Sequence, residues 1–262
     1  SILFMNNDIT SRTNPVVKRM KALATDPGAR REMGEFICDG RKLLEEALLE
    51  GALITCLLIG SSADERLAEA MRGRGVPCYR LPDDLLSYCA AVKTVTDAVF
   101  SCRIPEDSDT LKDGTSLLLD GLSDPGNVGT VIRTADAFAI RTVLVSEGTA
   151  DPYSPKAVRA SMGSIFRTRI VRGGRAELAD MLEKNKIPLY STVLSRLSRP
   201  PEEFDLSGAC IALGSESAGV SAEIVGRSSG EIFIPMPGSA ESLNVGVAAG
   251  IICYVASRGR EQ

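Results

Sequence analysis

Three short loops hold the residues of this chain that are best suited to chemistry. They span residues 123–129, 214–219 and 235–244, and each follows an apolar run that is typical of a buried strand. Ligands of open parallel sheets bind in the crevice beyond the carboxyl ends of the strands. The loops therefore predict one shared binding site, built from segments that are far apart in the sequence.

The same loops argue against the commonest nucleotide sites. None contains a GxGxxG fingerprint, and the first reads DPGNVGTVIRTA, in which Gly126 and Gly129 have no third glycine in register. A Walker A lysine is also missing. A Rossmann-type oxidoreductase and a P-loop enzyme are therefore both disfavoured.

The chain contains no histidine, which removes the commonest general base and the commonest metal ligand. Its seven cysteines lie at positions 38, 56, 78, 89, 102, 210 and 253, without a CxxC pair. This spacing favours core thiols in a reducing cytoplasm over zinc ligands or disulfides.

No signal peptide is expected, because the apolar residues 2–5 are too few for its apolar region and lack a basic flank. We interpret residues 1–4 as an addition ahead of a native Met5.

Two polar residues, one on the helix that follows the first loop and one in the second loop, are candidates for a catalytic role, and each has a structural alternative. Arg133 follows Asn127 by six residues, about 1.7 turns into the predicted helix, so its long side chain could reach the crevice. Its alternative role is a surface ion pair with Asp136. Glu216 stands among small residues, where it could equally be an acidic loop tip or a helix cap.

The third loop leads into a C-terminal helix that is apolar almost all the way round. Ser242 is the predicted N-cap, because a serine oxygen can accept an otherwise unpaired amide hydrogen, and Asn244 stands beside it. The apolar stretch 245–256 falls short of the roughly 20 residues that span a bilayer. We therefore expect a helix buried on more than one side, with Gly246 and Gly250 permitting close approach.

Strands and helices alternate along the whole chain, which is typical of α/β proteins. In the first part, strands are predicted at 35–38, 53–60 and 77–81, helices at 13–24, 40–50, 63–72 and 83–90, and an apolar segment lies near 98–103. In the second part, strands are predicted at 117–120, 142–146, 168–171, 188–193 and 210–213, and a further strand starts at 232. Helices are predicted from the first loop to about 138, at 154–161, at 176–184 and after 221. The polar residues 105–114 are the predicted linker. This gives a small α/β domain at 1–104 and, at 115–262, a parallel sheet with helices on both faces.

Basic residues are clustered, although the net charge is −4. One cluster lies between residues 11 and 31, where Asp26 is the only acid. It comprises Arg12, Lys18, Arg19, Lys21, Arg30 and Arg31. The other, with no acid between residues 153 and 175, comprises Lys156, Arg159, Arg167, Arg169, Arg172 and Arg175. Such segregation suits a phosphate backbone on one face, although solvated helix faces give the same pattern.

Three segments of the second part resemble the ordered motifs of the SpoU (TrmH-like) branch of the SPOUT RNA methyltransferases. They read DPGNVGTVIRTADAF, LGSESAGVS and IPMPGSAESLNVGVAAGI, and DPYSPKAVRASMGSIFR is similar to the family's segment between the first two motifs. The N-terminal sequence SRTNPVVKRMKAL…RREMGEFICDGRKLLEEAL resembles the small ribosomal-protein-like RNA-binding domain of many members. The resemblance therefore covers nearly the whole chain.

This resemblance implies a fold and an activity. The fold is a parallel-sheet SPOUT domain with a deep trefoil knot, preceded by a small α/β substrate-binding domain. The activity is transfer of a methyl group from S-adenosylmethionine to a ribose 2′-hydroxyl of RNA, by a homodimer without metal. The N-terminal domain favours ribosomal RNA; transfer RNA, or an inactive RNA-binding scaffold, are the alternatives.

By position in the motifs, the resemblance also assigns residues. The cofactor would be bound by Leu213, Gly214, Glu216, Ile234, Met236, Ser242, Leu243 and Asn244. The catalytic set would be Arg133, Asn127, Glu216, Ser242 and Asn244. The predicted RNA-binding set comes instead from the two basic clusters, and comprises Arg12, Lys18, Arg19, Lys21, Arg30, Arg31, Lys156 and Arg159. Ser217 departs from the family, which commonly has glycine there, so a positive φ at this position would be strained.

The residue types suit this chemistry. Ile234, Met236 and Leu243 offer an apolar slot for an adenine. Methyl transfer from a sulfonium needs positioning more than a metal. Since an arginine side chain is a permanent cation, Arg133 is expected to hold a phosphate and stabilise the developing alkoxide rather than remove a proton. Ser242 or Asn244 would orient the hydroxyl hydrogen.

Overall fold

The structure is a computed structural model, and it describes residues 8–61, 63, 65–91, 97–106, 111 and 114–258. The chain divides into two compact units, Ser1–Pro105 with Tyr153–Arg159, and Glu106–Pro152 with Ala160–Gln262. The first break falls at the start of the predicted linker 105–114, most of which lies outside the described residues, as do residues 1–4. The sequence pattern did not indicate that residues 153–159 group with the first unit.

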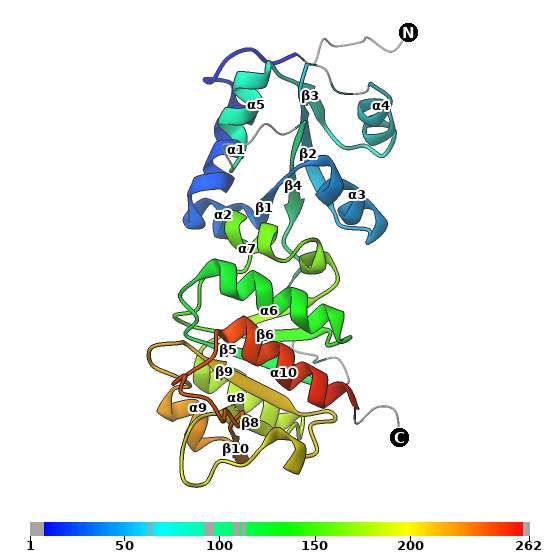
Figure 1. Cartoon of the computed structure of the whole chain (residues 1–262). Helices are drawn as coiled ribbons and strands as arrows, with labels where there is room; N and C mark the ends of the chain where they lie inside the picture. Colours follow the sequence, from blue (N-terminus) through cyan, green and yellow to red (C-terminus); the bar gives the residue numbers. More distant parts are fainter. Residues whose placement is uncertain are drawn as a thin grey trace. The chain divides into compact units, whose positions relative to one another are not determined.

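The first unit contains a four-stranded sheet in the order β1-β4-β2-β3 (Figure 1). β4 pairs antiparallel with both β1 and β2, whereas β2 and β3 are parallel. Its strands are β1 (Glu35–Asp39), β2 (Ile54–Ile59), β3 (Cys78–Arg80) and β4 (Ala98–Arg103). Its helices are α1 (Pro15–Thr25), α2 (Pro27–Met33), α3 (Arg41–Leu49), α4 (Glu65–Gly73) and α5 (Asp83–Cys89). All but the last residue of α7 (Pro155–Ala160) also belongs to this unit. The prediction of a small α/β unit is confirmed.

Local capping explains where the first two helices begin. The side chain of Asn14 accepts a hydrogen bond from the amide of Val16 at 2.8 Å, so α1 begins at Pro15 rather than at residue 13. Met20 and Leu23 of α1 are fully buried in the core. The sequence reading missed α2, whose seven residues are too few to show an apolar periodicity.

The second unit contains a six-stranded, all-parallel sheet in the order β10-β8-β9-β5-β6-β7. The strands are β5 (Ser116–Asp120), β6 (Thr142–Ser146), β7 (Arg169–Gly173), β8 (Leu189–Thr192), β9 (Cys210–Gly214) and β10 (Gly230–Ile232). The helices are α6 (Pro125–Ala137), α8 (Arg175–Lys184), α9 (Ala222–Gly226) and α10 (Val245–Arg258), with short 3-10 turns η1 (Ser164–Phe166) and η2 (Pro201–Glu203).

Helices cover both faces of this sheet, as predicted. Leu178 of α8 and Ile224 of α9 share a buried cluster with Leu118, Leu144 and Ala212 of the central strands. Successive residues of a strand point to opposite faces of the sheet. The residues next to Leu118, Leu144 and Ala212 therefore face the layer formed by α6 and α10, which lie side by side (Figure 1). The central strands are therefore buried on both sides, which explains their continuous apolar runs.

Helix α10 is capped by Asn244, the residue just before it, so the prediction of Ser242 as the N-cap is wrong. The Asn244 side-chain oxygen accepts a hydrogen bond from the amide of Gly246 at 2.9 Å, and its carbonyl accepts the first helical bond, from Ala248. A Cβ at Gly246 would lie 2.8 Å from Thr130 of α6, so this glycine permits the two helices to approach. Gly250 has no atom within 4 Å of such a Cβ, and plays no comparable part.

The burial of α10 is less complete than predicted. Ala249, Ile252 and Cys253 are fully buried, but Val247 and Tyr254 are each 53% exposed. An apolar strip of the helix therefore faces outward. Among the described residues, no helix has both the length and the apolar character needed to cross a bilayer.

Candidate functional site

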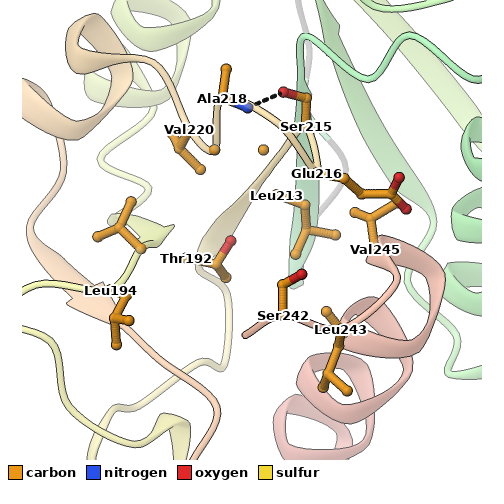
Figure 2. Close-up of a pocket in the computed structure, with 14 residues that line it drawn as sticks. Thr192, Leu194, Leu213, Ser215, Glu216, Ala218, Val220, Ser242, Leu243 and Val245 are labelled. Atoms are coloured by element: carbon orange, nitrogen blue, oxygen red, sulfur yellow. Dashed lines mark hydrogen bonds between the residues drawn. The ribbon is translucent and has the colours of Figure 1, made fainter. Parts of the chain in front are cut away.

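A hollow of about 370 Å³ lies at the carboxyl edge of the parallel sheet in the second unit. The ends of β8 and β9, the loop after β9 and the start of α10 form its walls (Figure 2). Among its lining residues are five of the predicted cofactor-binding residues, Leu213, Gly214, Glu216, Ser242 and Leu243. Figure 2 shows Leu194 on one side of this hollow and Leu243 and Val245 on the other.

A second hollow, of about 180 Å³, shares part of the same wall. It is lined by Ile234 and Met236, and again by Ser242 and Leu243. Both hollows are also lined by Thr192, Val193 and Leu194, which the sequence reading did not select. The sequence contained a signal for them, because they lie where the predicted strand 188–193 ends, and the three selected loops also follow the ends of strands.

The loop after β9 closes tightly on itself. A Cβ at Gly214 would lie 2.0 Å from the carbonyl carbon of Gly219, a distance no real side chain tolerates. The Ser215 hydroxyl accepts a hydrogen bond from the amide of Ala218 at 3.1 Å (Figure 2), and the amide of Gly219 donates to the Ser215 carbonyl at 2.9 Å. The left-handed position of this loop is Gly219, with φ of 68°. Ser217 is not among the described residues with positive φ, so the expected strain at Ser217 is not found.

The polar residues of the three loops meet beside the larger hollow. One carboxylate oxygen of Glu216 accepts hydrogen bonds from the side-chain amides of Asn127, at 3.1 Å, and Asn244, at 3.0 Å. The Asn244 amide also donates to the Asn127 side-chain oxygen at 3.2 Å. Glu216 is therefore neither a bare loop tip nor a helix cap. It fixes the orientation of two amide groups, each of which can bind a polar substrate group.

Arg133 is exposed on α6 and lines neither hollow of its own chain. The alternative of an ion pair with Asp136 is wrong, because that carboxylate binds Arg141 at 2.8 Å and Arg167 at 2.7 Å instead. Within the part of the chain that the structure describes, Arg133 has no hydrogen bond or ion pair. Its guanidinium is thus available to a ligand or a partner chain.

Asp120, at the carboxyl end of β5, holds the loops together and was also missed from the sequence. Its side chain, 1% exposed, accepts hydrogen bonds from the Ser146 hydroxyl at 2.8 Å, the Arg175 guanidinium at 2.7 Å and the Ser221 amide at 2.7 Å. Burial alone raises the pKa of Asp120, but these hydrogen bonds outweigh it, so the pKa lies below its ordinary value. The visible signal was an acid as the last residue of an otherwise apolar strand.

Replacing Asp120 by asparagine should lower the free energy of unfolding by on the order of 2 kcal/mol at pH 7, because the bonds of a charged acceptor are lost. Since the folded-state pKa is depressed, this stabilisation is complete above the unfolded pKa of about 3.9 and is lost as the pH falls through the folded value. Denaturant unfolding across pH should show the difference between variant and wild type shrinking below about pH 4.

Glu147 provides the matched control, because it binds the same Arg175 at 3.0 Å but is 54% exposed. Glu147→Gln should cost less than about 1 kcal/mol, as exposed ion pairs do. Equal losses in the two variants would show that Asp120 does not organise the site.

The predicted RNA-binding residues have unequal roles. In the first unit, the charged ends of Arg12 and Lys21 lie 4.6 and 4.8 Å from the ring centre of Tyr88. Arg19 instead binds the buried Glu35, and the buried Arg30 donates to the Leu23 carbonyl at 2.8 Å. Exposed positions are occupied by Lys18, Arg31, Lys156 and Arg159, the last two on α7. In the second basic cluster, Arg167 and Arg175 bind acids of their own unit, which weakens the charge argument there.

The cysteines do not form a reactive or metal-binding group. All seven are buried and free, and burial raises the pKa of Cys210 and Cys253 to about 12, so their thiols stay protonated at neutral pH. Among the described residues, no cluster of cysteine, aspartate and glutamate has the arrangement of a metal site.

Comparison with known proteins gives consistent matches. A family model described as the SpoU rRNA Methylase family matches residues 114–254, and the MRM3-like substrate binding domain matches residues 14–99. The chain is 34% identical over 250 residues to the 23S rRNA (guanosine(2553)-2'-O)-methyltransferase RlmP of Bacillus subtilis, covering 94% of this chain and 97% of that protein. It is 30% identical over 267 residues to the 23S rRNA (uridine(2479)-2'-O)-methyltransferase of Streptomyces viridochromogenes, covering 96% and 92%.

Solved structures agree with these relatives. The AdoMet-bound rRNA methyltransferase from Sinorhizobium meliloti has a TM-score of 0.86 at 29% identity, covering 96% of this chain and 97% of that one. The SpoU methyltransferase AviRb from Streptomyces viridochromogenes, in complex with AdoMet, has a TM-score of 0.83 at 28% identity, covering 95% and 99%. The similarity includes both units of the chain.

Proposed function

Because this chain belongs to the SpoU rRNA methylase family, we propose that it transfers a methyl group from S-adenosylmethionine to a ribose 2′-hydroxyl of ribosomal RNA. The observation that carries the proposal is the meeting of Asn127, Glu216 and Asn244, from three separate loops, beside one hollow. Relatives that match nearly the whole chain are named for 2′-O-methylation of 23S ribosomal RNA.

The larger hollow fits S-adenosylmethionine in size and character, and the smaller one extends its apolar wall. Small-molecule sites typically measure about 300–1,000 Å³ and are mostly apolar with a few polar groups. Here Leu213, Leu243 and Met236 supply apolar surface, and the closed loop after Gly214 brings backbone groups close to the larger hollow. S-adenosylmethionine, when bound, supplies an electrophilic methyl group on its sulfonium.

The chain's own residues would position the other reactant. Glu216 fixes the amides of Asn127 and Asn244, and Asn244 with Ser242 would orient the ribose hydroxyl. Arg133 would hold the neighbouring phosphate by charge-assisted hydrogen bonds and stabilise the negative charge that develops on the ribose oxygen. Arg133 thus acts through its positive charge and not as a base, and the proton of the ribose hydroxyl passes to water as the methyl group is transferred.

We also propose that the chain works as a homodimer. The outward strip of α10, with Val247 and Tyr254 each 53% exposed, belongs to the same layer as α6, and Tyr254 stacks edge-on with Phe138 at 6.4 Å. Pairing through this strip would cover it. Since Arg133 also lies on α6 and lines neither hollow of its own chain, we infer that it serves the hollow of the partner subunit.

The remaining parts of the proposal follow from the family. The deep trefoil knot would be formed by α10 and the loops before it, and the first unit would bind the RNA substrate, as the MRM3-like match suggests. A cytoplasmic location is part of the proposal, and ribosomal RNA as the substrate and seven free thiols support it. An inactive scaffold would have no need of the hollow and its fixed polar cluster.

Isothermal titration of the purified chain with S-adenosylmethionine should give a micromolar dissociation constant. The lining residues are mostly apolar and one wall is a closed loop, so the site exists before the ligand arrives. A chain that gives no heat signal at micromolar concentration would be a scaffold and would contradict the proposal.

The two cations beside Tyr88, Lys21 of α1 and Arg12 just before it, should matter for RNA binding. The double variant Arg12→Gln and Lys21→Gln should weaken binding to unmodified ribosomal RNA and lower the salt slope of log K by about 1.4 to 1.8, the loss of two phosphate contacts. Filter binding at several salt concentrations measures both. Lys42→Gln with Arg74→Gln removes two exposed cations from the same unit as a control. An equal effect of both pairs would show only non-specific attraction.

A further inference from the structure

The turn that follows β8 has two large apolar side chains in solvent. Leu194 is 85% exposed although it lines both hollows, and Leu197 is 77% exposed. Single exposed leucines need no explanation, but two on one turn at the rim of a ligand site indicate a surface that is covered during function.

Hydrogen bonds hold this turn in one conformation. The Ser195 amide donates to the Ser198 hydroxyl at 2.7 Å, and the Leu197 amide donates to the Ser195 hydroxyl at 2.9 Å. The Ser195 hydroxyl in turn donates to the Glu231 carboxylate. Backbone bonds from Arg199 to Glu231, at 3.0 Å, and from Phe233 to Arg199, at 3.1 Å, anchor its far end. The leucines therefore face outward because the backbone is fixed there.

The charge of the turn indicates what covers it. Arg196 lies between the two leucines, is exposed, and makes no hydrogen bond or ion pair with any residue that the structure describes. Arg199, by contrast, stacks on Phe204 at 4.8 Å and pairs with Glu203 at 3.6 Å. A free guanidinium beside apolar surface is complementary to a nucleotide, which presents a flat base and a phosphate.

We propose that the turn at residues 194–199 contacts RNA and selects the nucleotide whose ribose is presented to the larger hollow. Leu197 packs against a base, and Arg196 binds a neighbouring phosphate. The inference rests on the proposed function, since only an RNA substrate would bring a base and a phosphate to the rim of the cofactor hollow.

The test compares Arg196→Gln and Leu197→Ser in the full chain, with Lys184→Gln on α8 as a charge-matched control that lines neither hollow. The probe is ribosomal RNA from cells that lack the gene. Each turn variant should raise the KM for RNA about five- to tenfold, as loss of one base or phosphate contact does, with kcat and the Kd for S-adenosylmethionine unchanged. Arg196→Gln should also lower the salt slope of RNA binding by about 0.7 to 0.9, whereas Leu197→Ser should leave it unchanged.

Three results would overturn the inference. Wild-type KM and salt slope in both turn variants would remove the RNA contact while leaving the proposed methyl transfer intact. Dissociation of a dimer by Leu197→Ser, seen by light scattering, would assign the turn to a subunit interface. Failure of the wild-type chain to methylate RNA at all would instead remove the proposed function on which the inference rests.

Discussion

Replacing Arg133 by alanine should reduce methyl transfer to ribosomal RNA by about 10²- to 10³-fold, the loss typical of a removed oxyanion-stabilising donor. The affinity for S-adenosylmethionine should stay the same, because Arg133 lines neither hollow of its own chain. Arg133→Lys should also be strongly impaired, since a lysine cannot bind a phosphate through two parallel hydrogen bonds. Single-turnover rates and isothermal titration separate the two effects.

Arg141 is the matched control for Arg133. It lies just beyond α6, is 46% exposed, and its guanidinium is already bound to Asp136. Arg141→Gln should keep near wild-type turnover and cost less than about 1 kcal/mol in stability. Full turnover by Arg133→Ala would reject the catalytic role of Arg133.

The second large effect is expected from Gly214→Ala, which should weaken S-adenosylmethionine binding at least about 100-fold, or about 2.7 kcal/mol. The added methyl group would lie 2.0 Å from the carbonyl carbon of Gly219 and 2.1 Å from the amide nitrogen of Val220. Both are backbone atoms, so the loop has to open and move Ser215 and Glu216 from the wall of the hollow. Gly214 does not have positive φ, so the effect is one of space alone.

Gly226, at the end of α9, separates this effect from a general cost of the substitution. A Cβ there meets no atom within 4 Å, so Gly226→Ala should bind S-adenosylmethionine like the wild type and unfold at the same or a slightly higher temperature. Wild-type affinity in Gly214→Ala would show that the closed loop does not shape the hollow.

Mixing the two inactive variants tests the proposed dimer. If Arg133 serves the partner's hollow, a mixed dimer of Arg133→Ala and Gly214→Ala contains one intact hollow facing one intact arginine. Activity should then reappear on mixing. Absence of recovery, with mixed dimers demonstrated by mass, would place Arg133 in its own chain's site.

The parallel sheet and its three loops could be predicted because their signals are local. Buried strands are continuous apolar runs, and β6 occupies the predicted residues 142–146. The carboxyl ends of parallel strands share one edge, so the three loops were expected to form one site. Asn127, Glu216 and Asn244, which the family resemblance assigned to that site, do meet.

The missed features depend on three-dimensional contacts that leave little trace in local pattern. Asp120 matters because Ser146, Arg175 and Ser221 converge on it from distant segments. The grouping of residues 153–159 with the first unit likewise has no periodic signature. Ser242 and Asn244, two residues apart, are both residue types that favour a helix N-cap, so propensity does not show which of them caps α10.

The position of a transferred methyl group tests the account most directly. The purified chain should be incubated with tritiated S-adenosylmethionine and ribosomal RNA from cells that lack the gene, and the RNA then hydrolysed in alkali. A ribose without a free 2′-hydroxyl cannot cleave its neighbouring phosphodiester, so the account predicts label in one alkali-resistant dinucleotide. Label on a base, or label in transfer RNA with none in ribosomal RNA, would contradict it.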